Sequence, residues 1–391
     1  MPARTRRRFW IFFPAFTLAC SVVVTFASGT VPADATVPGL IGRIAFAADI
    51  DGRTDIWVRD FVSNVPVNVT GNIDEERQPA WSPDGTKLAY ASYGWLTGTG
   101  SIAVIDDTGG NFEILTDTAH DDWWPSWSRD GQTIVYTSTE DGPDQDIWVV
   151  DVDSKVRTNL TPDSSGDDYQ PEWSPDGSHI VFVSDRSGST DIWTMASGGA
   201  GPVNLTAAAA SDWAPSWSPD GSQIAFVSDR DSALGDVHVM ESDGTSVLRL
   251  TVNAEVLGRT AWSPDGTLIG FTSIKDGDLD VWMVAADGSS APGHLTDHPA
   301  NEFEVAWEPV SRPPVAVDDE FTVGVFDSLS GNLLDNDSDP DGDELTVVDI
   351  SSAGEPGSFT YQADGSFTYT PPGFPEVCHS PNRTASAASR P

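Results

Sequence analysis

Acidic side chains at one repeated position are the residues best suited to binding a ligand. Five residues before each of six regularly spaced tryptophans the chain carries Glu76, Asp122, Asp168, Asp212, Leu257 and Glu302. Four of the residues that come next are aromatic: Trp123, Tyr169, Trp213 and Phe303. Carboxylates beside aromatic rings can hold a hard cation, or accept a lysine or arginine side chain from a partner. The alternative is that each carboxylate accepts hydrogen bonds from nearby amides and shapes its own loop.

A second acidic group lies near the C-terminus. Alternate positions are aspartates: Asp335, Asp337, Asp339, Asp341 and Asp343. The order Asp-x-Asp-x-Asp-Gly resembles the start of an EF-hand calcium loop, although the twelfth position is Val348 and no helices are expected around it. Calcium between β-strands is therefore the one cofactor that the sequence suggests, and a solvated acidic turn is the alternative.

Signals for catalysis are few. The nucleophile motif Gly-x-Ser-x-Gly does not occur in the sequence. Of the six histidines only His294 and His298 lie close together, and a strand end and a turn separate them, so a shared metal is not expected. We therefore predict that the chain is not an enzyme.

A repeat of about 45 residues positions these side chains. The pattern Trp-Ser-Pro-Asp-Gly occurs at 81–85, 173–177, 217–221 and 262–266, with a near copy at 127–131 and a degenerate Trp-Glu-Pro at 307–309. Successive marker tryptophans are 46, 46, 44, 45 and 45 residues apart. An Asp-Ile-Trp pattern and a Leu-Thr pattern keep the same phase. Three Asn-x-Thr glycosylation motifs, at 68–70, 159–161 and 204–206, coincide with the last pattern and are interpreted as architecture.

Each repeat contains four short β-type runs separated by turn residues, which is typical of a propeller blade. The first blade begins without an inner strand, and residues 305–309 form an inner strand without a blade behind it. Joining the two predicts an all-β fold, a six-bladed propeller over residues 41–310 that closes by this strand exchange. The acidic position begins the innermost strand, so we expect the five carboxylates and four aromatic residues around one mouth of the central channel.

These motifs resemble the WD-like repeats of TolB-type propellers over about 270 residues. The most complete copies carry Ser-Asp-Arg at 184–186 and 228–230 after the second strand. The resemblance implies an exported, periplasmic protein whose propeller binds protein partners. TolB-type proteins also carry an α/β domain before the propeller, for which residues 35–44 leave no room. The resemblance therefore implies the fold and export more strongly than a particular partner.

The sequence changes character after a linker at 311–314. Residues 315–376 resemble bacterial cadherin-like, Ig-fold repeats, through Pro-Val-Ala-Val-Asp-Asp at 314–319 and Asp-Gly-Ser-Phe-Thr-Tyr-Thr-Pro at 364–371. Such repeats usually continue for two more strands, so we expect a truncated β-sandwich. Residues 377–391 have no strand pattern and are expected to be a disordered tail.

The N-terminus and the charge indicate export. Four arginines precede an apolar stretch and small residues, which is typical of a signal peptide over residues 1–35; an uncleaved anchor is the alternative. The formal net charge of −40 disfavours nucleic acid and anionic lipid, because both attract basic surfaces. After cleavage no other segment is apolar enough to span a membrane.

We therefore predict a periplasmic or cell-surface binding module, monomeric, whose propeller mouth binds a protein or peptide partner or a cation. A metal-dependent propeller enzyme of lyase or hydrolase type is one alternative. A structural or adhesive surface protein, in which the cadherin-like part matters most, is another.

Overall fold

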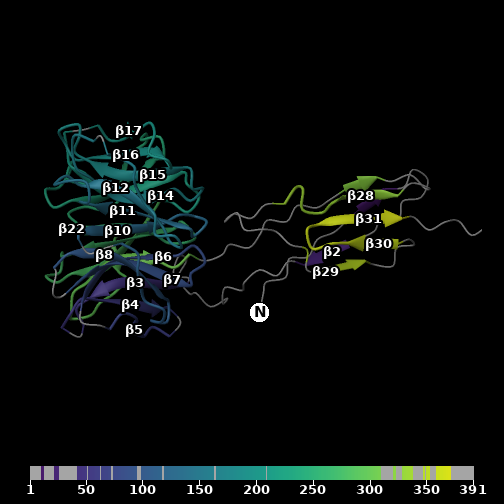
Figure 1. Cartoon of the computed structure of the whole chain (residues 1–391), viewed down its shortest axis with the longest axis horizontal. Coiled ribbons are helices and arrows are strands. Elements are labelled where there is room, and N and C mark those ends of the chain that lie inside the picture. The colour runs from purple at the N-terminus through teal and green to yellow at the C-terminus, as the bar shows by residue number, and fades with distance from the viewer. Residues whose placement is uncertain are drawn as a thin grey trace, which may run out of the picture. The chain divides into compact units, whose positions relative to one another are not determined.

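The computed structural model contains two compact units, Val31–Val310 and a second unit of Met1–Thr30 with Ser311–Pro391 (Figure 1). The structure describes residues 10–12, 22–25, 42–50, 52–61, 63–71, 74–94, 98–116, 119–162, 164–207, 209–309, 320–322, 328–337, 347, 349–352 and 358–370. Regular elements in these residues are β-strands, which confirms the all-β prediction. No helix that could cross a membrane occurs in the described part of the chain.

In the Val31–Val310 unit the described strands form six four-stranded antiparallel sheets, each named here by its inner strand, the one that ends in a marker tryptophan. Three sheets come first in the chain: β6 (Glu75–Trp81), β7 (Lys87–Tyr93), β8 (Gly100–Asp106) and β9 (Glu113–Ile114); β10 (Asp122–Trp127), β11 (Thr133–Ser138), β12 (Asp146–Asp151) and β13 (Arg157–Asn159); β14 (Asp168–Trp173), β15 (His179–Ser184), β16 (Asp191–Ala196) and β17 (Val203–Asn204). The other three are β18 (Asp212–Trp217), β19 (Gln223–Ser228), β20 (Asp236–Glu241) and β21 (Leu248–Arg249); β22 (Val256–Trp262), β23 (Leu268–Ser273), β24 (Asp280–Ala285) and β25 (Gly293–His294); β26 (Glu302–Trp307), β3 (Arg43–Ala48), β4 (Asp55–Asp60) and β5 (Pro66–Asn68).

The Ser-Pro-Asp-Gly motif forms the turn between the inner strand and the second strand. In the β6 sheet the Ser82 hydroxyl donates to Asp84 Oδ1 at 2.6 Å, and its oxygen accepts from the Lys87 amide at 2.9 Å. Gly85 closes this turn at a φ of 67°, a conformation that glycine adopts at low cost. The same serine-to-aspartate bond recurs in the following sheets, at Asp130, Asp176, Asp220 and Asp265. The repeated motif is therefore a device for a tight hairpin.

The β26 sheet joins distant parts of the chain, because β26 pairs antiparallel with β3. Next to this pairing Arg43 donates to both carboxylate oxygens of Glu308, at 3.0 and 2.6 Å, and to Asp107 at 2.8 Å. The Arg43 guanidinium also lies 4.8 Å from the centre of the Trp81 ring. These contacts tie β3, the end of β26 and the β6 sheet together.

Aromatic side chains fill the sheets and join them. The second strand of every sheet carries an aromatic residue with 0% exposure: Phe46, Tyr90, Tyr136, Phe182, Phe226 and Phe271. Three marker tryptophans donate an indole hydrogen bond to a carbonyl of the neighbouring sheet, at 3.1 to 3.2 Å: Trp127 to Ala80, Trp262 to Ser216 and Trp307 to Ala261. Each inner strand also contacts the inner strand of the next sheet, and β26 contacts β6.

Every inner strand contains a β-bulge, seen as a shift in its register with the second strand. Five of these bulges hold a non-glycine residue at a φ between 52° and 60°: Gln78, Trp124, Gln170, Ala214 and Glu304. Such residues cost on the order of 1 kcal/mol each unless the surroundings hold them. The bulge redirects a side chain at the same position of each sheet, three residues before the marker tryptophan.

The second unit contains a three-stranded antiparallel sheet of β28 (Leu329–Asn332), β31 (Ser366–Thr370) and β30 (Ser358–Tyr361). Phe367 and Tyr369 of β31 are buried there. β27 (Glu320–Thr322) pairs with β1 (Trp10–Phe12), and β29 (Asp349–Ser352) pairs with β2 (Val22–Thr25). Two strands thus fall within the predicted signal peptide, whose cleavage stays a prediction; an apolar run of β-branched residues suits a strand as well as a signal. The predicted tail lies outside the described residues.

Candidate functional site

The acidic residues predicted to surround the mouth begin the inner strands, as their spacing predicts. Their side chains are not at the surface, since each of the five residues is exposed by no more than 3%: Glu76, Asp122, Asp168, Asp212 and Glu302. The burial means that these carboxylates do not line an open surface, while their arrangement around one channel mouth stays a prediction. Of the neighbouring aromatic residues, Trp123, Tyr169 and Trp213 are half-buried, and Phe303 is buried.

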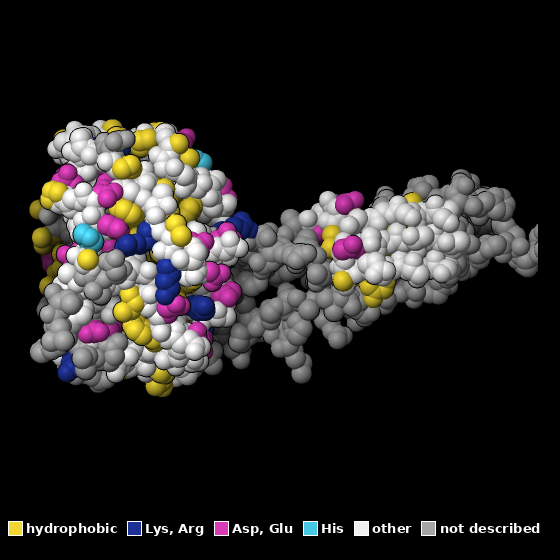
Figure 2. All heavy atoms as spheres, in the orientation of Figure 1, with side chains coloured by type: hydrophobic (Ala, Val, Ile, Leu, Met, Phe, Trp, Pro, Cys, Tyr) yellow, Lys and Arg dark blue, Asp and Glu magenta, His cyan; other side chains and the backbone are white. Residues whose placement is uncertain are grey.

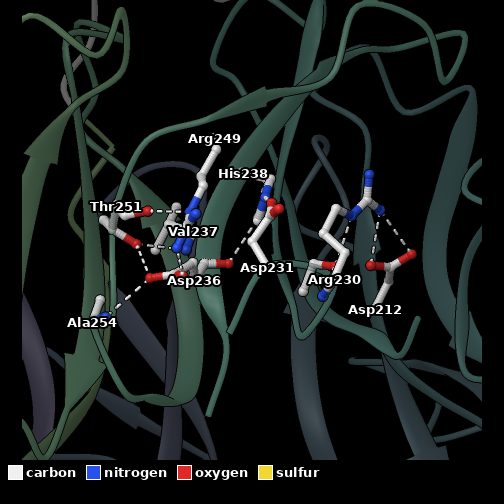
Figure 3. Close-up of polar contacts among 10 residues, drawn as sticks. Asp212, Arg230, Asp231, Asp236, Val237, His238, Arg249, Thr251 and Ala254 are labelled. Carbon is white, nitrogen blue, oxygen red and sulfur yellow. Dashed lines mark hydrogen bonds and ion pairs between the residues drawn. The ribbon is translucent and has the colours of Figure 1, made fainter. Parts of the chain in front are cut away.

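Two of these carboxylates pair with the arginine of a Ser-Asp-Arg motif. In the β18 sheet Arg230 donates to both oxygens of Asp212, at 3.0 and 3.1 Å, and its Nε donates to the Ser228 hydroxyl at 2.8 Å (Figure 3). In the β14 sheet Arg186 makes the corresponding ion pair with Asp168. Both aspartate side chains are 0% exposed, and a buried carboxylate is costly unless a positive charge accompanies it. The arginine of the motif therefore neutralises the buried acid of its own sheet.

The aspartate of the same motif holds the loop that leads into the inner strand. Asp185 Oδ1 accepts from the Asp167 amide at 2.9 Å, and Asp229 Oδ1 accepts from the Ser211 amide at 2.8 Å. Asp167 in turn accepts from the Gln145 amide of the preceding sheet at 2.9 Å. These aspartates shape the loops at this end of the unit, whereas Asp168 and Asp212 of the predicted site are held by arginines.

The other three carboxylates lack an arginine at the matching position, where the β6, β10 and β26 sheets have Gly94, Glu140 and Ile50. Burial raises the pKa of Asp122 to about 6, although hydrogen bonds from neighbouring hydroxyls oppose this change. Burial also raises the pKa of Glu302. Asp122 is consequently an acid whose charge state responds to pH near neutrality.

Sequence reasoning missed a series of hydrogen bonds between inner strands at the bulges. Glu304 Oε2 accepts from the Gln78 amide at 2.8 Å, and Gln78 Oε1 accepts from the Trp124 amide at 3.0 Å. Gln170 Oε1 accepts from the Ala214 amide at 2.9 Å. Each side chain satisfies a bulge amide of the next sheet. The signal in the sequence was a glutamine or glutamate three residues before the marker tryptophan, at three repeats out of six.

The sequence analysis also missed Arg259, which reaches across from the β22 sheet. Its Nη2 donates to Glu172 Oε2 of the β14 sheet at 3.0 Å, and its Nη1 donates to the Pro125 carbonyl of the β10 sheet at 3.4 Å. The Arg259 side chain is 11% exposed. Burial raises the pKa of Glu172, and it raises the pKa of Glu304 to about 7. Arg259 thus links the inner strand β22 with β14 and β10, neither of which belongs to a sheet next to its own.

The Asp-Ile-Trp and Asn-x-Thr patterns belong together in the structure. The aspartate accepts from the asparagine and the threonine of the fourth strand, as Asp55 does from Asn68 at 2.9 Å and Thr70 at 3.2 Å. Asn159 and Asn204 bind Asp146 and Asp191 in the same way. The asparagines of the three glycosylation motifs are therefore engaged in packing, as the architectural interpretation predicts.

The β18 sheet departs from this arrangement (Figure 3). Arg249 stands where the β26, β10 and β14 sheets have asparagine, and it binds Asp236. His238 replaces the tryptophan and is 1% exposed, with Nδ1 3.0 Å from the Asp236 carbonyl and Nε2 3.2 Å from Asp231. The histidine thereby connects the third strand to the loop that precedes it.

Exposed acids also occur at the end of the strands where the inner strands begin, both in β6 and in loops between second and third strands. The side chains of Glu75, Asp276 and Asp231 are 59%, 53% and 43% exposed. Arg77 is 39% exposed, and its guanidinium lies 5.4 Å from the centre of the Phe303 ring. Figure 2 shows acidic side chains on the face of the Val31–Val310 unit in view, with several lysines and arginines among them. The half-buried rings of Trp123, Tyr169 and Trp213 belong to the same end of the strands as these exposed acids.

The predicted calcium site is only partly within the described residues. Asp335 and Asp337 lie in the turn after β28, Asp335 exposed and Asp337 half-buried. Asp339, Asp341 and Asp343 lie outside the described residues. Within the part that the structure describes, no group of three or more histidine, cysteine, aspartate or glutamate side chains is arranged to hold a metal ion. His294 contacts Asp276 at 3.0 Å and its ring lies 3.9 Å from that of Trp282.

Comparison with known proteins identifies both parts of the chain. The family model for the TolB β-propeller domain matches residues 78–212 and 204–309, and the model for the bacterial cadherin-like domain matches residues 311–386. A Tol-Pal system protein TolB of Desulfosudis oleivorans is 37% identical over 75 residues, which are 19% of this chain and 16% of that protein. The match thus spans less than a fifth of the curated relative.

Solved structures agree on the fold. TolB of Acinetobacter baumannii superposes with a TM-score of 0.60 and 24% identity, covering 68% of this chain and 66% of that one. Kuenenia stuttgartiensis hydrazine synthase has a TM-score of 0.57 and 15% identity, covering 71% of this chain and 47% of that one. At these identities the likeness concerns the fold alone.

Proposed function

The chain belongs to the TolB β-propeller domain family, and on that basis we propose that it is an exported module that binds a protein partner. The match to a Tol-Pal system protein and the arginine-rich, apolar N-terminus support this assignment. Binding is favoured over catalysis because the best-placed acids, Asp168 and Asp212, are each occupied by an arginine of their own sheet.

In this proposal the six sheets are the six blades of a closed ring. The antiparallel pairing of β26 with β3 and the contact of β26 with β6 support closure. The Arg43 cluster supplies the polar contacts at that junction. A closed ring leaves no inner sheet edge open to other chains, which matters for a binding protein at high local concentration. Domain limits follow the same reasoning: residues 41–310 for the propeller and 315–376 for the cadherin-like part.

The partner surface that we propose is the end of the ring where the inner strands begin. The observation that carries it is the placement of the half-buried rings of Trp123, Tyr169 and Trp213 at equivalent positions of three consecutive sheets. Aromatic rings provide much of the binding energy in protein interfaces. The exposed acids Glu75 and Asp276 of the surrounding loops favour a partner segment that carries lysine or arginine.

The buried carboxylates have a supporting role in this surface. Asp168 and Asp212 fix the arginines of their own sheets, and the guanidinium of Arg230 lies 5.2 Å from the centre of the buried Phe226 ring. The partner would thus meet an acidic, aromatic surface built on rigid strands.

The test is partner capture from an envelope extract with the full-length chain immobilised, followed by identification and purification of the captured protein. Trp123→Ser with Trp213→Ser should reduce its affinity at least tenfold, and the affinity should fall as salt rises. Phe112→Ser is the control, because Phe112 is 50% exposed but lies in the turn before β9, at the opposite end of the strands. Equal losses in the two variants, or none in either, would refute the proposed surface.

A further inference from the structure

A groove lies between the β18 and β22 sheets, and its volume is about 900 Å³. One wall is formed by Val239 and Leu248 of the β18 sheet, and the other by Met283 and Ala285 of β24. Gly266, the last residue of the marker motif, and Thr267 in the same turn also line it. This turn is at the end of the inner strand, so the groove is on the side of the ring opposite to the proposed partner surface.

The groove exists because one turn stands away from the neighbouring sheet. Four turns between third and fourth strands contain an equivalent glycine at positive φ: Gly109, Gly199, Gly244 and Gly288. A Cβ atom on any of the first three would lie only 2.6 to 2.7 Å from a carbonyl oxygen of the preceding sheet, so those turns are in close contact with it. A Cβ atom on Gly288 would meet nothing nearer than the Leu250 side chain, at 3.6 Å.

Two local features of the sequence account for this difference. Seven residues (286–292) separate β24 from β25, whereas six (242–247) separate β20 from β21. In addition, Gly293 occupies the position at which the β14 and β18 sheets carry Val203 and Leu248. A Cβ atom on Gly293 would have no neighbour within 4 Å, so a side chain is missing there.

The lining of the groove is apolar inside and acidic at its rim. Leu248 is 47% exposed although it is a large aliphatic residue. Among the described residues that line the groove, Glu241 and Asp287 are charged and none is lysine or arginine. Hydrogen bonds from the Ser289 hydroxyl and amide lower the pKa of Asp287, which keeps its carboxylate ionised. An apolar groove with carboxylates at its rim is complementary to an aliphatic side chain next to a cationic one.

We propose that this groove is a second docking site, which binds an extended segment of a protein partner in which lysine or arginine alternates with aliphatic residues. In an extended chain successive side chains point to opposite sides, so aliphatic residues can enter the groove while basic residues reach Glu241 and Asp287. The site is separate from the surface proposed above, and a single partner or two partners could occupy the two ends of the ring.

The probe is the peptide acetyl-Lys-Val-Lys-Leu-Lys-Val-amide, with the corresponding glutamate peptide as its charge-reversed counterpart. Binding is followed in the full-length chain by NMR of methionine methyl groups. Met283 lines the groove, whereas Met195 is buried in the β14 sheet and reports on non-specific effects. The lysine peptide should shift the Met283 signal in a saturable way and leave that of Met195 in place, and the glutamate peptide should bind at least tenfold more weakly.

Gly293→Phe should fill the groove and abolish the saturable shift. Gly198→Phe is the matched control, because Gly198 lies in the equivalent turn of the β14 sheet and a Cβ atom there also has no neighbour within 4 Å. Asp287→Lys changes an exposed side chain, leaves the interior untouched, and should weaken the lysine peptide at least fivefold. An absent Met283 shift, equal binding of both peptides, or equal losses in the two phenylalanine variants would overturn the proposal. None of these results would change the outcome of the partner-capture test with the Trp123 and Trp213 variants. The two proposals can therefore fail separately.

Discussion

Removing Arg43 should weaken the propeller more than removing any exposed arginine, because this residue joins the two ends of the repeat array. Arg43→Met deletes two hydrogen bonds to Glu308 and one to Asp107, together with the stacking on Trp81. It also leaves two carboxylates close together without a cation. The side chains involved are 18% to 25% exposed, so solvent screens this cost only in part.

The magnitude follows from those contacts. A hydrogen bond to a charged group contributes about 1.5–3 kcal/mol, and orphaning a fully buried charge costs about 3–5 kcal/mol. Because the bonds are not additive and the site is partly exposed, we expect a loss of about 3 kcal/mol. For a domain of this size each kcal/mol lowers the melting temperature by roughly 2–4 °C, so the shift should be about 6–12 °C.

Urea unfolding of the full-length chain, followed by the fluorescence of its 15 tryptophans, measures this loss. Arg129→Met is the control, because Arg129 is exposed and donates to the Pro175 carbonyl at 3.3 Å rather than to a carboxylate of the junction. Adding Glu308→Gln to Arg43→Met should recover part of the loss, since it removes one of the stranded charges. If Arg43→Met lowers the free energy of unfolding no more than Arg129→Met does, the junction does not depend on the Arg43 contacts. Those contacts would then give no support to ring closure.

Asp122→Asn should raise the melting temperature near pH 8 and change it little near pH 4. The folded pKa of about 6 exceeds the ordinary 3.8, so the stability due to protonation is complete below 3.8 and is lost as the pH rises through 6; parallel thermal scans that show no pH-dependent difference would contradict this. Arg230→Met should cost about 3 kcal/mol in urea unfolding by stranding the buried Asp212, and adding Asp212→Asn should restore most of it; a cost below about 0.5 kcal/mol would contradict the ion-pair account. Calcium near millimolar concentration should raise the melting temperature of the second unit, and Asp335→Asn with Asp337→Asn should abolish the rise; a flat response in the unchanged chain would leave the acidic-turn alternative.

The arrangement of strands could be predicted because each marker encodes a local device. The Ser82 and Asp84 side chains make their turn with residues no more than five positions away, so the motif is legible in one repeat. The start of each inner strand follows from its fixed distance to the marker tryptophan. The sequence therefore predicted where the five acids stand along the strands, which the structure confirms.

Burial of those acids could not be predicted in the same way, because it depends on contacts between strands. Arg230 reaches Asp212 across 18 residues and Arg186 reaches Asp168 across the same interval. This interval of 18 residues between aspartate and arginine can be recognised in the sequence if the acid is assumed to be buried. Acids exposed to solvent at a channel mouth would have the same residue types, so the sequence does not distinguish the two cases. Arg259 is harder still, since its partners Glu172 and Pro125 are 87 and 134 residues away and belong to sheets that the repeat does not place beside it.

A side chain that recurs at one position of the repeat contributes first to its own sheet, as the buried acids of five inner strands illustrate. Contacts that occur only once are found where a repeat departs from its pattern. Glu308 replaces the motif serine and binds Arg43 at the junction, and Gly293 replaces an aliphatic residue and leaves a groove open. Such departures carry no benefit for an isolated blade, since glycine weakens a strand and a partly buried charge needs a partner. The groove at Gly293 is therefore a candidate site that the repeat pattern alone does not predict, and the repeated positions provide its rigid support.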